Sequence, residues 1–332
     1  MERICIEATG SDKGFQETAD GAKKSLEEDS SLKLTLVAAK DRMPSHYSLD
    51  SRIELIEADY TACIDNRNNR TKSYIYKALE MHRNGDVNAV IAPGDTGTTV
   101  VYSLNILKKI PGVLRPAIPT HWPFNNVLID SGANTDCTPE NLLQFAIMGK
   151  IYSQNYLNVD NPLIGVLSNG TESYKGNTLA KQSKELISKL REKNYNISEN
   201  YFEGTCFADL NKGQVIVTDG HTGNIALKTA EVALKTALDK VKEKISEQNF
   251  LMKSLAYFAM RSPSKKLKQE FDYRSYATAP LLGVNGNVMI CHGRSDSEAI
   301  ANAILKTKKY LGCNIKLKLE EELAKYGEKE LL

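Results

Sequence analysis

The feature of this 332-residue sequence that most constrains its fold is one local pattern that recurs along the chain. An apolar run of strand length is followed by a loop rich in Gly and small polar residues, and then by a run with helical periodicity. The pattern occurs six times, in RICIEATGSDKG (3–14), NAVIAPGDTGTTVVYSL (88–104), VLIDSGANTDCTPENLLQFAIMGK (127–150), PLIGVLSNGTESYKGNTLAKQ (162–182), QVIVTDGHTGNIALKTAEVAL (214–234) and NVMICHGRSDSEAIANAI (287–304). Further strands are expected at 34–39 and 52–58. Strands that alternate with helices predict an α/β fold, a mainly parallel sheet with helices on both faces.

The third of these units carries the clearest helix start. Its apolar run ends at Asp130 and Gly132, and Thr138-Pro139-Glu140 supplies an N-cap, a proline at the first helical position and an acidic first turn. The loop therefore lies against a helix N-terminus, where free N–H groups and the helix dipole favour a negatively charged ligand. Because parallel strands bring their carboxyl ends to one edge, we expect the six loops to line one cleft.

Composition narrows the classes of function. The 43 Lys and Arg residues nearly balance 41 Asp and Glu, and the formal net charge of +2 gives no reason to expect a nucleic-acid partner. The six cysteines lack a CxxC pair or a zinc spacing, so we expect neither disulfides nor a metal. MERICIEATG lacks a signal-peptide core, and no apolar run approaches the ~18 residues of a membrane span. We therefore expect a cytoplasmic protein.

Three of the loops carry groups that bind anions close to a strand end or a helix start. They are Lys175 with Asn177, His221 with Asn224, and His292 with Arg294. Asn224 and Lys228 lie one turn apart on one helix face, so both can address the same group. Several helix N-termini with adjacent Lys, Arg, His and Asn predict a phosphate or carboxylate pocket. For each residue alone, a turn, cap or solvated side chain stays open as the plainer interpretation.

Motifs of other chemistries are absent from the sequence. It has no GxxxxGK followed by Ser or Thr, and ATGSDKG does not supply GxGxxG, which argues against a Walker-type ATPase and a simple dinucleotide enzyme. No GxSxG occurs, so a serine hydrolase is poorly supported. Cys137 stays open as a thiol nucleophile, although a small half-buried cysteine before a helix is the plainer interpretation.

Residues 246–276 differ in character from the rest of the chain. SEQNFLMKSLAYFAMRSPSKKLKQEFDYRSY combines large apolar residues with Lys and Arg, and Ser-Pro interrupts it. A helical hairpin at a dimer interface is our first interpretation. A basic, aromatic surface that contacts anionic lipid or an acidic protein is the second, and the two are compatible.

Taken in order, the motifs resemble the acyl-carrier-protein-dependent phosphate acyltransferase family of bacterial phospholipid synthesis, PlsX. The resemblance covers nearly the whole chain. It is carried by PGDTGT (93–98), RPAIP (115–119), LIDSGANTDCTPENLLQFAIMGKIYS (128–153), NPLIGVLSNGTESYKGNTL (161–179), VTDGHTGNIALKTAE (217–231) and APLLGVNGNVMICHGRSDSEAIANAI (279–304).

The resemblance implies a fold, a reaction and partners. The fold would be a single two-lobed catalytic unit over 1–332, similar to isocitrate and isopropylmalate dehydrogenases, with the cleft between the lobes and a homodimer as the assembly. The reaction would transfer a fatty acyl group from acyl carrier protein to inorganic phosphate, with no metal or organic cofactor. The acyl phosphate would pass to a membrane glycerol-phosphate acyltransferase. Peripheral membrane contact is implied too, and 246–276 is its natural candidate.

This chemistry suggests roles for the candidate residues. We hypothesise that Lys175 and Asn177 hold phosphate together with Asn224 and Lys228. Asn134 and the backbone at 132–134 would orient the reacting groups, and His292 would donate a hydrogen bond or a proton. Asp219 would fix loop geometry or a partner's charge. The candidate catalytic residues are thus Lys175, Asn224 and His292, and the binding positions also include Gly94, Thr96 and Gly132.

Several positions depart from the family pattern. The family's opening DAMGGD is replaced by a sequence that starts at Glu7, and Asp95 places a carboxylate where the family's GNTGA has a neutral amide. If Asp95 faces the pocket, it opposes phosphate binding unless a lysine neutralises it. His221 replaces an aromatic or aliphatic residue, and Thr278 lies where the family has GGAPLLG. These changes are compatible with a different acyl donor, acceptor or carrier.

Two other functions stay open. The first is a coenzyme A-dependent phosphate acyltransferase of the acetyl or butyryl type, which would need a nucleotide pocket. The second is a non-catalytic relative that binds lipid or carrier protein. A dehydrogenase is the weakest alternative, because no set of metal-binding aspartates is evident and fold alone does not give function.

Overall fold

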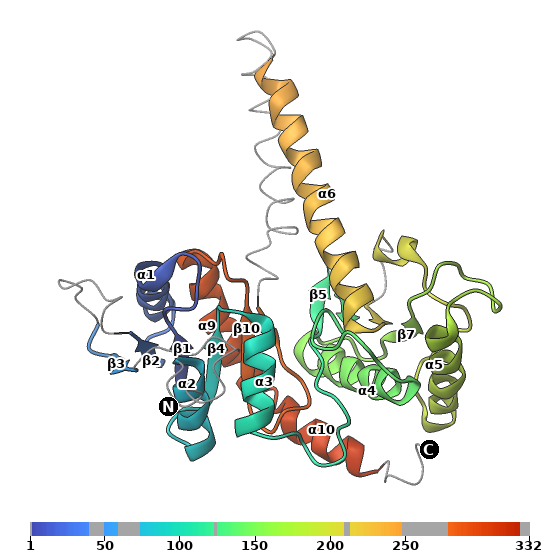
Figure 1. Cartoon of the computed structure of the whole chain (residues 1–332), viewed down its shortest axis with the longest axis horizontal. Coiled ribbons are helices and arrows are strands. Elements are labelled where there is room, and N and C mark those ends of the chain that lie inside the picture. Colours follow the sequence, from blue (N-terminus) through green and yellow to red (C-terminus); the bar gives the residue numbers. More distant parts are fainter. Residues whose placement is uncertain are drawn as a thin grey trace.

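The computed structural model describes residues 2–39, 50–58, 74–122, 125–208, 213–247 and 278–325. Within these ranges, strands and helices alternate along the chain and form two sheets, each packed against its own helices (Figure 1). The chain begins in the first sheet, builds the second and then returns to the first. The predicted α/β fold with mainly parallel strands is confirmed.

The first sheet has six strands in the order β3-β2-β1-β4-β10-β9. Their bounds are β1 Arg3–Glu7, β2 Lys33–Ala38, β3 Ile53–Glu57, β4 Ala89–Ala92, β9 Thr278–Pro280 and β10 Val288–Cys291. The strands from β3 to β10 are parallel, and β9 runs antiparallel to β10 at the edge. All four residues of both β4 and β10 are buried, as expected for parallel strands covered on both faces.

The second sheet has four strands in the order β5-β6-β8-β7. Their bounds are β5 Thr120–Trp122, β6 Asn126–Ile129, β7 Leu163–Val166 and β8 Gln214–Val217. Strands β6, β8 and β7 are parallel, and β5 is an antiparallel edge strand. The antiparallel strands β5 and β9 were not predicted from the sequence, because each has only three residues and no helix follows it.

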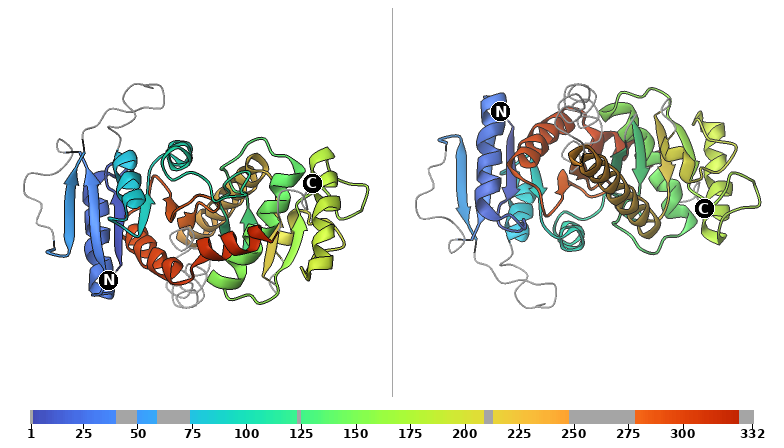
Figure 2. Two further views of the ribbon diagram at one scale, coloured as in Figure 1. Left: turned by 90° about the horizontal axis from the view of Figure 1, so that it is seen from below. Right: turned by 90° about the horizontal axis from the view of Figure 1, so that it is seen from above.

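Helices cover both faces of the first sheet (Figure 2). They are α1 Gly14–Glu28, α2 Tyr74–Asn84, α3 Thr96–Ile106 and α9 Ser297–Gly312. Alternate residues of β1 enter different clusters: Ile4 and Ile6 pack with the apolar faces of α1 and α9, whereas Cys5 packs with those of α2 and α3. Since side chains alternate across a strand, these helix pairs lie on opposite faces.

The remaining helices accompany the second sheet. They are α4 Pro139–Tyr156, α5 Thr178–Ser188, α6 Gly220–Ser246 and α10 Ile315–Ala324, with short 3-10 turns at Lys189–Lys193 and Gly204–Ala208. The predicted start of α4 is confirmed, because Thr138 is its N-cap and Pro139 its first residue. Helix α6 projects away from the rest of the molecule (Figure 1). Of the segment 246–276 only its first two residues are described, so the predicted helical hairpin lies outside the described residues. No helix within the described ranges is long and apolar enough to cross a membrane.

The loop after β6 is built around one buried carboxylate. Asp130 is 0% exposed, and its Oδ1 accepts the N–H groups of Ile118 (3.0 Å) and Gly132 (3.2 Å). The N–H of Ala133 lies 3.1 Å from both oxygens, and Oδ2 accepts the N–H and the side-chain amide of Asn134 at 2.8 Å each. Burial raises the pKa of Asp130, and these N–H donors oppose that shift. This carboxylate therefore fixes the shape of the 130–138 loop.

The substitution Asp130→Ala tests this role. It leaves five inward N–H groups without their acceptor. We expect the free energy of unfolding to fall by at least about 3 kcal/mol, measured by urea unfolding. Asp136→Ala, at an exposed position of the same loop, is the matched control and should change it by less than about 0.5 kcal/mol. Equal effects of the two variants would contradict the role given to Asp130.

Candidate functional site

At the carboxyl ends of the strands, five of the six predicted loops contact another loop of their own sheet. In the first sheet, the loop after β1 meets the loop after β10 through Asp12 N–H, which donates to the Gly293 carbonyl at 2.8 Å. In the second sheet, the Gly220 N–H at the start of α6 donates to the Asn134 carbonyl at 2.7 Å. A Cβ on Gly223 would lie 1.9 Å from the Asp130 carbonyl oxygen, so only glycine permits this approach.

The loops after β1 and β4 also lie together. A Cβ on Gly94 would lie 3.4 Å from Glu7 Oε2 and 3.7 Å from the Gly10 Cα. Thr96, the first residue of α3, follows two residues after Gly94. The binding positions Gly94 and Thr96 are thus at the carboxyl end of the first sheet, and Gly132 and Asn134 are at that of the second.

In most of these loops, backbone N–H groups already donate to side-chain oxygens of the protein itself. The side chains of Asp95, Asn177, Asp219 and Asp296 cap the helices α3, α5, α6 and α9 by accepting an N–H of the first turn. Glu7, which is 4% exposed, accepts the N–H groups of Thr9 (3.0 Å) and Gly10 (2.6 Å). The chain's own oxygens thus satisfy part of the anion-binding capacity that the sequence predicted for helix N-termini.

This finding changes several expected roles. Asp95 accepts both the N–H and the hydroxyl of Thr98, so its carboxylate serves the α3 cap. Asp219 does the same for Thr222, in agreement with a role in loop geometry. The N–H groups at 132–134 are taken by Asp130, and Asn134 also donates to the Pro116 carbonyl at 2.7 Å. In this structure they are therefore not free to orient an oxyanion.

A cluster of charged side chains connects the two sheets. Lys228 of α6, which follows the second sheet, places its Nζ 2.8 Å from Nε2 of His292, which follows β10 of the first. The same Nζ lies 3.0 Å from Glu231 Oε2, and Arg294 Nη2 lies 3.7 Å from that oxygen. We call Lys228, Glu231, His292 and Arg294 the bridging cluster.

The bridging cluster determines the protonation state of His292. A lysine ammonium has only donors, so Nε2 of His292 must be the acceptor and carry no hydrogen. Burial lowers the pKa of His292, and Lys228 and Arg294 lower it further, whereas Glu231 and Asp12 act in the opposite direction. Both effects favour a neutral His292 with an accepting Nε2 in the resting arrangement.

Two predicted catalytic residues lie apart from this cluster. Asn224 is exposed on α6 and faces the loop after β6, since a Cβ on Gly132 would lie 3.9 Å from its Oδ1. Lys175 lies in the loop after β7, with its Nζ 5.7 Å from the centre of the Tyr174 ring. Within the described part of the chain, no hydrogen bond or ion pair joins Lys175 to Asn224 or Lys228.

The site residues predicted from the sequence did not include Glu231, and no role was predicted for Arg294. The signal for Glu231 was present, because it lies three residues after Lys228 and thus on the same face of α6. Its contact with the loop after β10 depends on the distance between the two sheets, which a local pattern cannot give. Asp130 was likewise noted only as the end of a strand.

Cysteines and metal ligands add little to the site. Burial raises the pKa of the Cys137 thiol to about 12, which disfavours the thiolate that a nucleophile needs. The described cysteines Cys5, Cys137, Cys291 and Cys313 are free thiols. Among the described residues, no group of three or more His, Cys, Asp or Glu side chains is placed to hold a metal ion.

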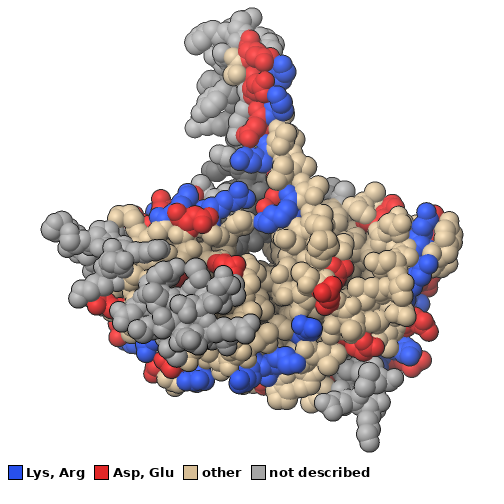
Figure 3. Space-filling view, viewed as in Figure 1, with Lys and Arg blue, Asp and Glu red and all other residues tan. Residues whose placement is uncertain are grey.

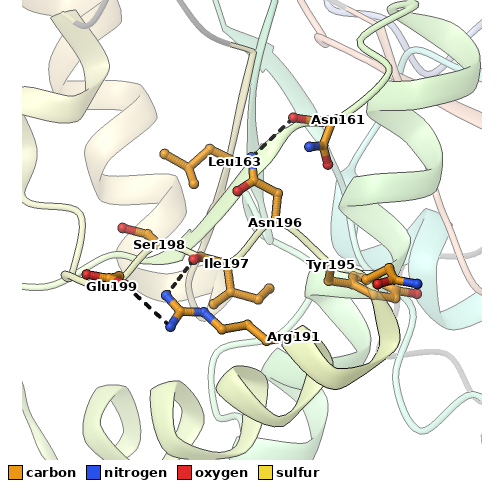
Figure 4. Close-up of a pocket in the computed structure, with 9 residues that line it drawn as sticks. Asn161, Leu163, Arg191, Tyr195, Asn196, Ile197, Ser198 and Glu199 are labelled. Atoms are coloured by element: carbon orange, nitrogen blue, oxygen red, sulfur yellow. Dashed lines mark hydrogen bonds and ion pairs between the residues drawn. The ribbon is translucent and has the colours of Figure 1, made fainter.

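A cavity of about 680 Å³ lies elsewhere, beside the amino end of β7 (Figure 4). Arg191 crosses it, donating to the Ile197 carbonyl at 2.8 Å and pairing with Glu199 at 3.7 Å. Because ligands of parallel sheets bind at the carboxyl ends of the strands, and the candidate loops lie there, we place the functional site at the loops and not in this cavity.

Comparisons with known proteins extend over nearly the whole chain. A family model described as "Fatty acid synthesis protein" matches residues 2–318. The phosphate acyltransferase of Campylobacter concisus is 37% identical over 98% of this chain and 100% of its own, and that of Aliarcobacter butzleri 36% over 99% of each. The phosphate acyltransferase of Nitratiruptor sp. is 34% identical over 97% of this chain and 98% of its own.

Solved structures with lower identity share the fold. A phosphotransacetylase from Streptococcus pyogenes has a TM-score of 0.59 at 14% identity, and the EutD phosphotransacetylase from Staphylococcus aureus 0.57 at 16%; each match covers 93% of this chain and 94% of the other. A putative 4-hydroxythreonine-4-phosphate dehydrogenase from Salmonella typhimurium has a TM-score of 0.52 at 12%, over 94% and 100%. By its family model and its curated relatives, this chain belongs to the fatty acid synthesis protein family, that of the phosphate acyltransferases.

Proposed function

We propose that this protein is an acyltransferase that moves a fatty acyl group from acyl carrier protein to inorganic phosphate, giving acyl phosphate for phospholipid synthesis. Its family and the names of its relatives support this activity. The observation that carries the site is the bridging cluster, where Lys228 and His292 from different sheets meet at 2.8 Å. Side-chain cations and an accepting imidazole next to each other suit a phosphate that must be held and then deprotonated.

The proposed reaction needs few groups. A phosphate oxygen attacks the thioester carbonyl carbon, a C–O bond forms, and the C–S bond breaks as the thiol leaves. A thiol has a pKa near ~8.5, so it departs as thiolate with modest help. Lys228 and Arg294 would hold the phosphate charge, and His292 Nε2 would accept the phosphate proton once Lys228 turns from this nitrogen to the phosphate.

Lys175, Asn177 and Asn224 keep their proposed roles at this site. Lys175 and Asn224 would contact the transferred phosphate or the developing oxyanion, with Asn177 beside them at the start of α5. Gly94, Thr96, Gly132 and Asn134 would shape the walls, and Asp219 would hold the turn into α6. Since Lys175 stands apart in this structure, its role requires the loop after β7 to approach the bridging cluster when substrates bind.

A coenzyme A-dependent phosphate acyltransferase is the second candidate function. The observation that favours it is the likeness in fold to the two phosphotransacetylases. Their sequence identity of 14–16% supports the fold alone, whereas the relatives at 34–37% are named phosphate acyltransferase. We therefore prefer acyl carrier protein as the donor.

The assembly and the finer fold are part of this proposal. We propose a homodimer, peripheral contact with the membrane through 246–276, and transfer of the product to a membrane glycerol-phosphate acyltransferase. We also propose a single two-lobed unit related to isocitrate and isopropylmalate dehydrogenases, supported by the dehydrogenase match. The projection of helix α6 away from the rest of the molecule supports a contact surface on this helix.

The direct test is phosphate-dependent thiol release from a long-chain acyl carrier protein, with the same chain on coenzyme A in parallel and hydroxylamine trapping of acyl phosphate. We expect turnover with the carrier protein and trapped product only when phosphate is present. Turnover with coenzyme A alone would favour the second candidate. No turnover with either donor, in a folded protein, would point to a non-catalytic relative.

Lys175→Ala tests the least connected of the proposed catalytic residues. If Lys175 stabilises charge in the transition state, kcat/KM for phosphate should fall about 100-fold or more. Lys181→Ala, an exposed lysine of α5 near the same loop, serves as the control and should keep near-full activity. Full activity of Lys175→Ala with an unchanged phosphate dependence would remove this residue from the site.

A further inference from the structure

The bridging cluster contains a carboxylate that the proposed reaction does not use. Glu231 lies on α6 one turn after Lys228, and both of its oxygens are near Lys228 Nζ, at 3.3 and 3.0 Å. Its Oε2 also lies 3.7 Å from Arg294 and 4.0 Å from His292 Nε2. One carboxylate thus faces a lysine of the second sheet's helix and two residues of the first sheet's loop.

Other ion pairs on α6 provide a comparison for the pair of Lys228 with Glu231. Lys240 with Glu243 and Lys244 with Glu247 form the same i,i+3 pairs at 2.8 Å, and charged side chains of both signs line the projecting helix (Figure 3). The side chain of Glu243 is 49% exposed, whereas that of Glu231 is 26% exposed and adjoins another loop. Exposed ion pairs contribute little to stability. The effect of Glu231 therefore depends on its neighbours in the adjoining loop.

We infer that Glu231 is a positioning residue of the proposed reaction: it holds the Lys228 ammonium against His292 Nε2 and lies where an anionic substrate would meet Lys228 and Arg294. The inference rests on the proposed function. Its structural support is the geometry of the bridging cluster. A phosphate that approaches these cations must compete with Glu231. The carboxylate therefore weakens phosphate binding while it keeps Lys228 beside the imidazole.

The charge of Glu231 also acts on His292. The groups that face the imidazole are Lys228 and Glu231 of α6, Arg294 of its own loop and Asp12 of the loop after β1. Glu231 and Asp12 favour the imidazolium, and the two cations disfavour it. Removal of the Glu231 charge must lower the pKa of His292, so the loss of activity caused by its protonation should move to lower pH.

The test compares Glu231→Gln with the wild type and with Glu243→Gln, which breaks the same kind of pair far along the same helix. We expect KM for phosphate to fall about 2- to 5-fold in Glu231→Gln, the size of one partly exposed charge interaction. The acid limb of kcat/KM should shift to lower pH, and the titration of His292, followed by NMR of labelled histidine, should shift in the same direction. The titration of phosphate itself is common to all variants and cancels in the comparison.

Two further arms separate the outcomes. Glu231→Asp keeps the charge and should retain the wild-type acid limb. A lower kcat in Glu231→Gln with KM, acid limb and His292 titration all unchanged would overturn the inference, because only a structural role would remain. If no donor gives phosphate-dependent turnover, the proposed function fails, but the His292 titration still decides whether Glu231 acts on the imidazole.

Discussion

This structure depends on one requirement. The backbone N–H groups at the ends of the parallel strands need hydrogen-bond acceptors. Each strand-to-helix turn leaves several such groups near the start of a helix. Asp130 accepts five donors, Glu7 binds the turn after β1, and side-chain oxygens of Asp95, Asn177, Asp219 and Asp296 cap four helices. Hydrogen bonds made within the protein thereby hold the first turns of these helices.

The same bonds restrict how an anion can be bound. Where the chain's own carboxylates satisfy the turns, affinity for phosphate must come largely from lysine, arginine and histidine side chains. The bridging cluster supplies them, and it does so from both sheets, since Lys228 follows β8 and His292 follows β10. Such a site exists only while the two sheets keep their distance, which ties the binding of substrate to the arrangement of the whole fold.

The sequence predicted much of this architecture and less of the site. The recurring strand, loop and helix pattern identified the strands that became β1, β4, β6, β7, β8 and β10, and the Thr138-Pro139 signal located the start of α4. Local patterns missed β5 and β9, whose three residues carry no periodicity, and the helices α2 and α10. They also missed the roles of Asp130 and Glu231. Those roles arise from neighbours distant in sequence: Ile118 for Asp130 and Arg294 for Glu231. The helix start at Pro139 was identified correctly, but whether a side chain of the protein already occupies a helix N-terminus is a matter of tertiary structure.

The central claim is that Lys228 and His292 act as one unit across the two sheets. A double-mutant cycle with Lys228→Met, His292→Gln and the double variant measures their coupling through kcat/KM for phosphate in acyl phosphate formation. The account predicts strong non-additivity, with the double variant hardly worse than the more damaged single variant, because either change breaks the same contact. Additive losses within about 0.5 kcal/mol would show that the two residues act independently and would contradict the account.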